Sequence, residues 1–547
     1  MKQNKSVMYI FLEGAAAVFV ILMLGFFPLF YQNNYIDISS AKLSFFRVCV
    51  IGLFLFIVVF AALDWLQRFK EEMLVNSRVP QNKKTEKQRV SEVIREYLSG
   101  VSIPAWFAVM FVAGICIATI FSINPLESWQ GREGRKLGAM VWLLCVAMYV
   151  MLTKYLRPGK WMIWTFLVSN ILVCLLAILN FWAIDPLGMY ENLMEAQHAM
   201  FISTIGNVNA CASYLCMVLP AGMALYFLCK DRKLQAAIGT FLILGFWTSY
   251  CTKSQSWLLG VGISLLIMFW FAMCDHHHMR RFLEICSLFW ISSVLMKLTL
   301  LIGESKNFLG LMFRNFKVEG FQNRVMLNGY VLIIMGILLF GAIFYIQSRE
   351  RQGKELPYQA LRKGVFLFFA LMAVAAVLLL VVANLNRSAW EGTFSWLNHL
   401  KLQDTFGSNR GYIWKITIKS WLDMPFWKKL TGYGVNCYHM LIQQYGGEGV
   451  ADVFGGAILV DAHNEFLQFM TTMGIVGTVG YFGLLISTVV TSLKKYAKQP
   501  EFLLGVAVVC GYAAQAMVNN PTVFLTPYLF LVLGIIRSLE KLGDVAE

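Results

Sequence analysis

The stretch DAHNEFLQFMTTMGIVG, Asp461–Gly477, lies where a long polar segment runs into an apolar one. We predict a helix that starts here, with Asp461 as its N-cap and His463 in its first turn. A His at that place stands beside free backbone N–H groups and the positive end of the helix dipole, where an anion such as a pyrophosphate is received. The alternative is a His that only satisfies carbonyl groups at a helix start.

Three glycines follow this helix start, at Gly474, Gly477 and Gly480. Their spacing gives a helix one face of small residues. Such a face lets a second helix approach closely within a bilayer.

The composition is that of a membrane protein. Of the 547 residues, 58% are hydrophobic and 14% are charged, and the mean hydropathy is +0.62. A soluble domain of this composition would lack a polar surface, and apolar runs of about 20 residues recur along the chain. Backbone groups are not solvated in lipid and the runs do not alternate as barrel strands do, so the spans must be helical. We therefore predict an all-α polytopic membrane protein with about 14 transmembrane helices.

The expected spans are separated by short polar connections. They lie near residues 7–30, 45–66, 103–123, 137–153, 161–183, 207–229, 235–252, 257–273, 283–302, 328–347, 365–384, 475–493, 502–519 and 524–537. Lys and Arg gather in alternate connections, above all in the polar segment 67–102, whereas the loop after residue 183 is acidic. This alternation predicts a multi-pass protein of the cytoplasmic (plasma) membrane with both termini in the cytoplasm.

This pattern divides the chain into four parts. Residues 1–102 form two N-terminal helices and a basic cytoplasmic loop, residues 103–384 a transmembrane core, residues 385–474 an extracytoplasmic loop, and residues 475–547 the C-terminal helices. The one long extracytoplasmic loop is expected to carry short helices and the active site, because long loops in tightly connected proteins are usually functional.

Several residues of this loop suit a glycan phosphate. A helix that begins near Arg410 would place Trp414 on the same side, next to other basic residues at the membrane surface. Tryptophan rings offer stacking faces for sugars, although each one could equally be an interfacial anchor. Gly432 and Gly434 let the backbone turn sharply or approach a ligand closely.

Other features point away from metals and nucleic acid. The twelve cysteines lie almost all within spans and form no Cys-x-x-Cys pair, so neither disulfides nor a zinc knuckle are expected. His276, His277 and His278 are adjacent and would point in different directions on a helix, so we predict no metal site and no cofactor. The net charge of +15 is spread over loops that also carry acidic residues, which argues against nucleic acid as a partner.

Several motifs, taken in chain order, resemble the O-antigen ligase family of polytopic glycan transferases, which includes O-antigen polymerases. The resemblance covers roughly residues 100–540 and leaves the first two helices as an added piece. It is carried by GNVNACASYL (206–215), SQSW (254–257), Arg410 with Trp414, GYG (432–434), and His463-Asn464 followed by Leu467 and Gly474.

The resemblance implies a metal-independent transferase on the outer face of the cytoplasmic membrane. The donor would be a glycan on undecaprenyl pyrophosphate, and the acceptor a hydroxyl group of a glycan, a lipid or a protein. Arg410 would hold the pyrophosphate through paired, charge-assisted bonds. His463 would act as general base or would orient the acceptor. Asn464, Trp414, Gly434 and Asn209 would contact the substrates, although Asn209 and its neighbour Asn207 could equally cap a helix.

The chain departs from the family at residues 254–256, Ser-Gln-Ser, where a Ser-Arg-Gly-like sequence is usual. Gln255 thus replaces an arginine that binds phosphate, and Lys253 is close enough to substitute for it. Arg314 and Lys317, in the expected outer loop 303–327, are further phosphate-binding candidates. A segment that lies on the outer headgroups is the favoured interpretation of that loop.

Two other classes of protein are possible. A transporter or lipid-glycan flippase should carry charged residues within its spans, and Glu13 and Lys297 are the clearest of a small number. A structural scaffold would leave His463 and Arg410 without a purpose. The sequence therefore favours chemistry at the membrane surface, with ligase and polymerase both open.

Overall fold

The computed structural model describes residues 7–76, 101–304, 318, 320–385, 390–401, 403–447 and 450–543. This part of the chain is helical except for one short antiparallel pair, β1 (Phe201–Ile202) and β2 (Gly206–Asn207). The predicted all-α class is therefore confirmed. Arg314, Lys317 and most of the basic segment 67–102 lie outside the described residues.

Ten helices in the described ranges are long and apolar enough to cross a membrane. They are α1 with its continuation η1 (Val7–Val20, Ile21–Phe26), α2 (Ile38–Asn76), α4 (Ile103–Ile120), α7 (Trp161–Phe181), α8 (Val208–Leu228), α9 (Arg232–Cys251), α11 (His276–Glu304), α12 (Gly329–Arg351), α13 (Tyr358–Leu385) and α19 (Gly474–Tyr496). The other predicted spans coincide with shorter helices: α6 (Ala139–Tyr155), α10 (Ser256–Ala272), α20 (Leu503–Ala516, after η6, Pro500–Phe502) and α21 (Thr526–Ser538). A polytopic membrane protein is thus confirmed, and the count of about 14 spans stays a prediction.

Short helices fill the connections. In the predicted long loop they are η5 (Gly392–Leu400), α14 (Phe406–Asp423), α15 (Phe426–Thr431), α16 (Tyr438–Tyr445), α17 (Val450–Val453) and α18 (Glu465–Thr472). Elsewhere they are α5 (Pro125–Gln130), η2 (Glu195–Met200), η4 (Gln322–Met326) and α22 (Glu540–Gly543). α14, α16 and α18 share a small apolar core of their own, with Tyr438 and Leu441 fully buried in it.

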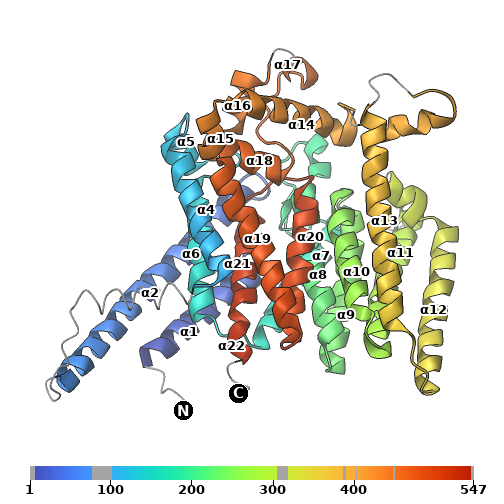
Figure 1. Ribbon diagram of the computed structural model, residues 1–547, viewed down its shortest axis with the longest axis horizontal. Helices are drawn as coiled ribbons and strands as arrows, with labels where there is room; N and C mark the ends of the chain where they lie inside the picture. Colours follow the sequence, from blue (N-terminus) through green and yellow to red (C-terminus); the bar gives the residue numbers. More distant parts are fainter. Residues whose placement is uncertain are drawn as a thin grey trace.

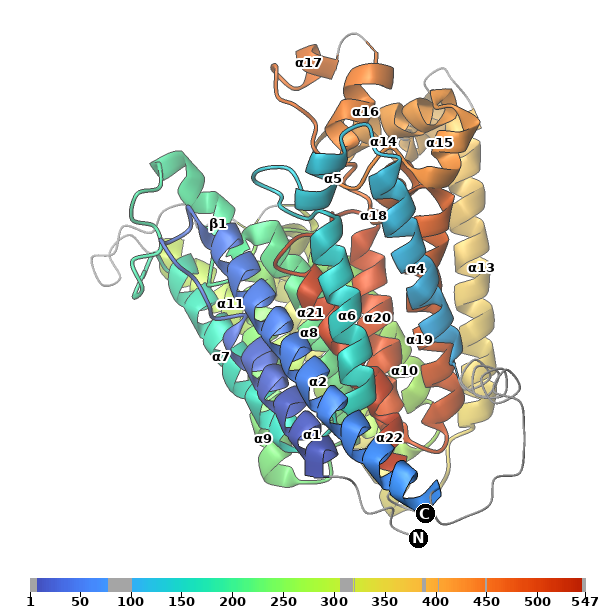
Figure 2. The same ribbon diagram turned by 90° about the vertical axis from the view of Figure 1, so that its left-hand side faces the viewer.

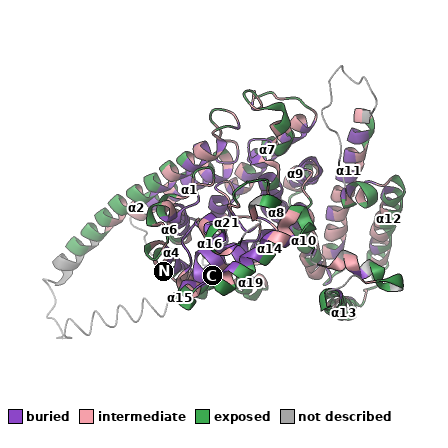
Figure 3. Cartoon of the chain, turned by 90° about the horizontal axis from the view of Figure 1, so that it is seen from above, coloured by how far each residue is buried: buried purple, intermediate pink, exposed green. Residues whose placement is uncertain are grey.

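The long helices lie side by side in a bundle, and α14 to α17 gather at one end of it (Figures 1 and 2). α8 is the most enclosed, packed by α9, α10 and α20, while α4 pairs with α19 and α6 with α21. Seen from above, α12 and α13 lie at one side and are largely exposed (Figure 3). α1 begins and α22 ends at the end of the bundle opposite α14 to α17 (Figure 1).

The small-residue face of α19 packs against α4. A Cβ atom on Gly480 would lie 2.5 Å from the backbone nitrogen of Phe111 and 2.6 Å from its Cα. A Cβ atom on Gly114 of α4 would likewise collide with the backbone of Gly477. The predicted close helix packing at Gly477 and Gly480 is therefore confirmed.

We expect Gly480→Val to destabilise the fold by about 1–3 kcal/mol or more, because its side chain meets backbone rather than a movable side chain. The measurement is the thermal unfolding of the purified protein in detergent. Gly262→Val in α10 is the matched control, since a Cβ atom there meets nothing within 4 Å. Equal unfolding temperatures for the two variants would contradict this packing.

Candidate functional site

The segment that leads into α18 has a different local structure from the predicted one. α18 begins at Glu465, and its N-cap is Asn464, whose side chain accepts a hydrogen bond from the Leu467 N–H at 3.0 Å. The prediction that Asp461 caps this helix is therefore wrong, and His463 precedes the helix rather than lying in its first turn. His463 has φ +47°, a backbone conformation uncommon for a residue with a side chain and often associated with functional sites.

Asp461 is instead the centre of a polar cluster. Its carboxylate forms an ion pair with Arg135, from the connection between α5 and α6, and accepts a hydrogen bond from Asn520, between α20 and α21. Nε2 of His463 lies 3.4 Å from Oδ1 of Asp461, and Nδ2 of Asn520 lies 3.3 Å from Nδ1 of His463. Three segments far apart in the sequence thus meet at His463.

His463 and Arg135 open into a cavity of about 360 Å³. Its polar wall carries amides and hydroxyls besides these two residues, namely Asn207, Asn209, Ser213, Asn519, Asn520 and Thr522. Asn207 lines the cavity and also caps α8, where its side chain accepts from the Asn209 N–H at 2.9 Å. The predicted substrate-binding residue Asn209 lies in the same wall.

The lining of the cavity also includes the N-terminal part of the chain. Tyr35, Ile36, Ile38 and Ser39, at the start of α2, line the cavity together with Phe201 and Phe524. Tyr35 is fixed by a hydrogen bond from its hydroxyl to the Ser203 carbonyl at 2.8 Å and by stacking on Phe201. The N-terminal piece is therefore part of the cavity, which the sequence did not indicate.

Arg410 reaches the same site from α14. Its Nη2 lies 3.4 Å from Oδ1 of Asn519, and Asn519 in turn donates to Ser213 and Gln515, each at 3.0 Å. Left-handed backbone at Gly407, Ser408 and Asn409 precedes it, so regular helix starts at Arg410, as predicted. Arg410 therefore contacts a residue of the cavity wall.

Buried contacts anchor the helix behind His463. Glu465 is 1% exposed and accepts hydrogen bonds from Tyr481 of α19 at 3.0 Å and Tyr512 of α20 at 2.5 Å. Burial raises the pKa of Glu465 to about 7. Asn464 also donates to the Met517 carbonyl at 2.9 Å, so its role in the structure is to fix the helix start.

Burial, together with two nearby arginines, favours the neutral form of His463. Burial, the largest cause, lowers the pKa of His463 from its ordinary value of 6.5; Arg410 and Arg135 lower it further, and Asp461 opposes them. At neutral pH the imidazole is therefore uncharged and able to accept a proton.

The other predicted site residues lie elsewhere. Lys253 and Gln255, at the start of α10, do not line the cavity, and Nζ of Lys253 lies 5.8 Å from the centre of the Phe181 ring. Trp414 packs against the small core around α16. At Gly434 a Cβ atom would collide with the side chain of Ser122, so this glycine makes room for that side chain.

Sequence reasoning did not find Arg135, Asn519 and Asn520, and it assigned Asp461 the wrong role. A signal existed for the two amides, because Asn519-Asn520 stands as a polar pair before Pro521 between two apolar runs. Arg135 could have been noticed as a cation in a connection expected on the outer side.

The three adjacent histidines each contact a different side chain. His276 contacts Tyr358, His277 contacts Arg280, and His278 contacts Asp275. In the described part of the chain one group could hold a metal ion: Cys274, Asp275 and His278, whose ligand atoms lie within 4.8 Å of one another. It is far from His463, and Asp275 already uses one oxygen to accept the His278 N–H at the start of α11.

The fold and the cavity together define a polytopic membrane protein with a polar, arginine-bearing site at one end of its helix bundle. Residues 327–482 match the family model Wzy_C, described as O-Antigen ligase. The match contains Arg410, Trp414, Gly434, His463 and Asn464, and it confirms the resemblance to this family over these residues. The resemblance at residues 206–215 and 254–257 lies outside the match and stays a prediction. A comparison with curated proteins finds no match.

Over these residues the chain is therefore similar to the O-antigen ligase family.

Proposed function

We propose that the protein transfers a glycan from an undecaprenyl-pyrophosphate donor to a hydroxyl acceptor. The observation that carries this proposal is that His463 and Arg135 line one cavity and both contact the buried Asp461. Arg410 contacts Asn519 of the cavity wall, and residues 327–482 match the O-antigen ligase model. A polymerase of the same family is the second candidate, because it would use the same donor and the same site.

His463 serves as the general base. The imidazole carries its proton on Nε2, which faces Asp461, and Nδ1 therefore has a free lone pair. This lone pair takes the proton of the acceptor hydroxyl, and the hydroxyl takes the place of Asn520 at Nδ1. Asp461 stabilises the imidazolium that forms. The acceptor oxygen bonds to the anomeric carbon while the bond from that carbon to the pyrophosphate oxygen breaks.

Arginine side chains stabilise the leaving group. Pyrophosphate gains negative charge as the bond breaks, and preorganised cations are most effective where charge develops. Arg135 lines the cavity with its side chain 39% exposed, and its planar guanidinium matches phosphate oxygens. Arg410 lies behind Asn519 and supports the same region.

The reaction is assigned to the outer face of the cytoplasmic membrane, with both termini in the cytoplasm. The support is the distribution of Lys and Arg in the sequence, together with the position of the start of α1 and the end of α22, opposite α14 to α17 (Figure 1). The chemistry described here needs only side chains of the chain, so we propose a metal-independent transferase.

The testing experiment uses the purified protein with an undecaprenyl-pyrophosphate glycan, EDTA and a panel of acceptors. Glycosylated acceptor with EDTA present supports the proposal, and the acceptor that reacts separates ligase from polymerase. Transfer that stops with EDTA and returns with added metal would contradict metal independence.

The pH dependence follows from the neutral imidazole. We expect the transfer rate to fall as pH drops through the pKa of His463, below its ordinary 6.5. Asp461 raises that pKa, so Asp461→Asn moves the acidic limb of the rate profile to lower pH besides slowing transfer. The measurement is the initial transfer rate against pH for both proteins. An acidic limb that stays in place or moves to higher pH would contradict the Asp461–His463 contact.

A further inference from the structure

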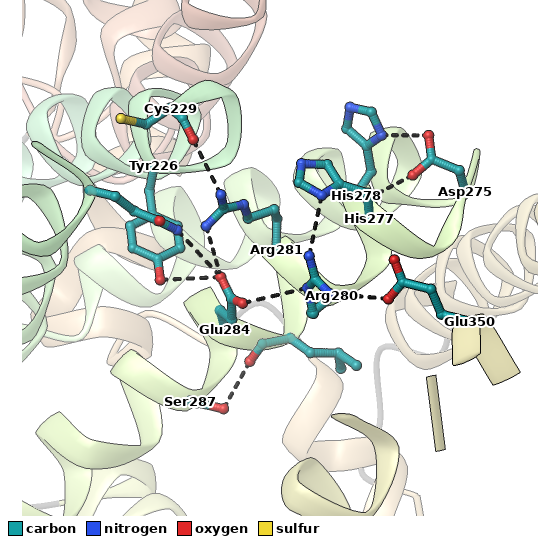
Figure 4. Close-up of polar contacts among 12 residues, drawn as sticks. Tyr226, Cys229, Asp275, His277, His278, Arg280, Arg281, Glu284, Ser287 and Glu350 are labelled. Atoms are coloured by element: carbon teal, nitrogen blue, oxygen red, sulfur yellow. Dashed lines mark hydrogen bonds and ion pairs between the residues drawn. The ribbon is translucent and has the colours of Figure 1, made fainter. Parts of the chain in front are cut away.

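The end of the bundle opposite the cavity carries many cations, and several are neutralised by neighbours. Figure 4 shows Arg280 bonded to Glu350 at 3.0 Å and Arg281 bonded to Glu284 at 3.2 Å. The carboxylate of Asp275 likewise contacts the ring of His278 (Figure 4). These groups form a closed network that leaves little charge for a ligand.

Arg362 and Lys363, near the start of α13, are different. No ion pair to an acidic group is found for either within the described ranges. The guanidinium of Arg362 lies 4.1 Å from the centre of the Trp270 ring, and its Nε is buried without a hydrogen-bond partner. A buried donor without a partner is costly unless a ligand supplies an acceptor.

These two cations border a cavity of about 370 Å³. Its wall consists of Trp270 and Phe366, whose rings pack edge to face, with Gln359, Arg362 and Lys363, and it includes no acidic residue. Positive charge beside tryptophan at the end of membrane helices is the environment of a lipid headgroup. A second cavity, which shares Gln359 and Lys363, continues toward Asp275 and Glu355.

α13, which begins at this cavity, has an apolar surface that is exposed along its length. In the most apolar window of α13 none of the residues is buried, and the mean hydropathy of the window is 3.2. α13 packs chiefly against η5 at its far end. Most of its surface is therefore available to contact lipid. A ligand with an anionic head and long apolar chains satisfies both the cations and this surface, whereas free phosphate satisfies only the cations.

We propose that Arg362 and Lys363 bind the phosphate of an anionic phospholipid, with its acyl chains along Phe366 and the surface of α13. The site is separate from the cavity at His463 and does not depend on the proposed transfer reaction. The lipid would hold the N-terminal end of α13 in place. The C-terminal end of α13 is followed in the chain by η5 and then by α14, the helix that carries Arg410.

The test compares phosphatidylglycerol with phosphatidylcholine on the delipidated full chain, with retained lipid measured by native mass spectrometry. We expect the wild type to prefer phosphatidylglycerol, and Arg362→Gln with Lys363→Gln to weaken its retention by about 30-fold. Arg351→Gln with Lys354→Gln is the matched control: it removes two exposed cations of the same end outside the 370 Å³ cavity and should keep the preference.

Arg362→Lys guards against a folding effect, because it keeps the charge and should retain most of the binding. Wild-type protein without a preference for the anionic lipid would overturn the proposal, as would equal retention by the double variant and the control. Inorganic phosphate that binds as tightly as the lipid would show an anion site instead and would also overturn it.

Discussion

His463→Ala is expected to abolish glycan transfer, with a loss of about 10²–10⁴-fold, the range contributed by a general base. The imidazole can accept a proton near pH 7, because its pKa lies below 6.5, and it faces both the cavity and the buried Asp461 carboxylate. The measurement is the amount of surface glycan in cells that express the variant, normalised to the amount of membrane-inserted protein.

The fold should survive this change. The polar contacts of His463 with Asn520 and Asp461 are long, at 3.3 and 3.4 Å, and the residue lies outside the helices. α18 is anchored by Asn464 and Glu465 instead. His198→Ala, a histidine outside the cavity wall, is the control and should leave glycan display intact. Normal glycan display by His463→Ala would contradict the assigned role.

Arg135→Ala should cost about as much as removal of a single oxyanion donor, roughly 10²–10³-fold in rate. The cation that faces the leaving pyrophosphate is lost, and the buried Asp461 loses its ion-pair partner. The same change removes a positive charge that lowers the pKa of His463, so the acidic limb of the rate profile should move to higher pH. The measurement is the transfer rate across the pH range.

Arg132→Ala is the matched control, because it removes the same charge from the same connection but does not line the cavity. Arg135→Lys should recover only part of the rate, since an ammonium group cannot make the paired contacts of a guanidinium. If Arg132→Ala and Arg135→Ala reduced transfer equally, the loss would reflect the general charge of the loop and not a phosphate contact.

Local patterns in the sequence predicted the helices and the glycine face of α19 correctly, because both depend on spacing along one segment. The position of His463 at a helix start was nearly correct. The choice between Asp461 and Asn464 as cap was not decidable locally, since both are good N-cap residues. Tertiary contact decides it: Arg135 and Asn520 engage Asp461 and leave Asn464 to cap.

Local sequence patterns could not predict which residues line the cavity. Its wall joins the start of α2, the start of α8, the connection before α6 and the one after α20, and no spacing rule relates these segments. The role of Gly434 also could not be predicted from the local sequence. A glycine permits either a ligand or a backbone to approach, and only the structure shows that Ser122 fills the space.

We propose that the donor is cleaved in the cavity lined by His463 and Arg135, a region that Arg410 supports through Asn519. The most direct measurement is transfer from a purified undecaprenyl-pyrophosphate glycan by wild type, His463→Ala and Arg410→Ala, with EDTA present and donor binding measured in parallel. We expect transfer only by the wild type, and donor binding that His463→Ala retains. Wild-type protein that binds the donor but cleaves none of it with any acceptor would contradict the account and favour a lipid-glycan transporter.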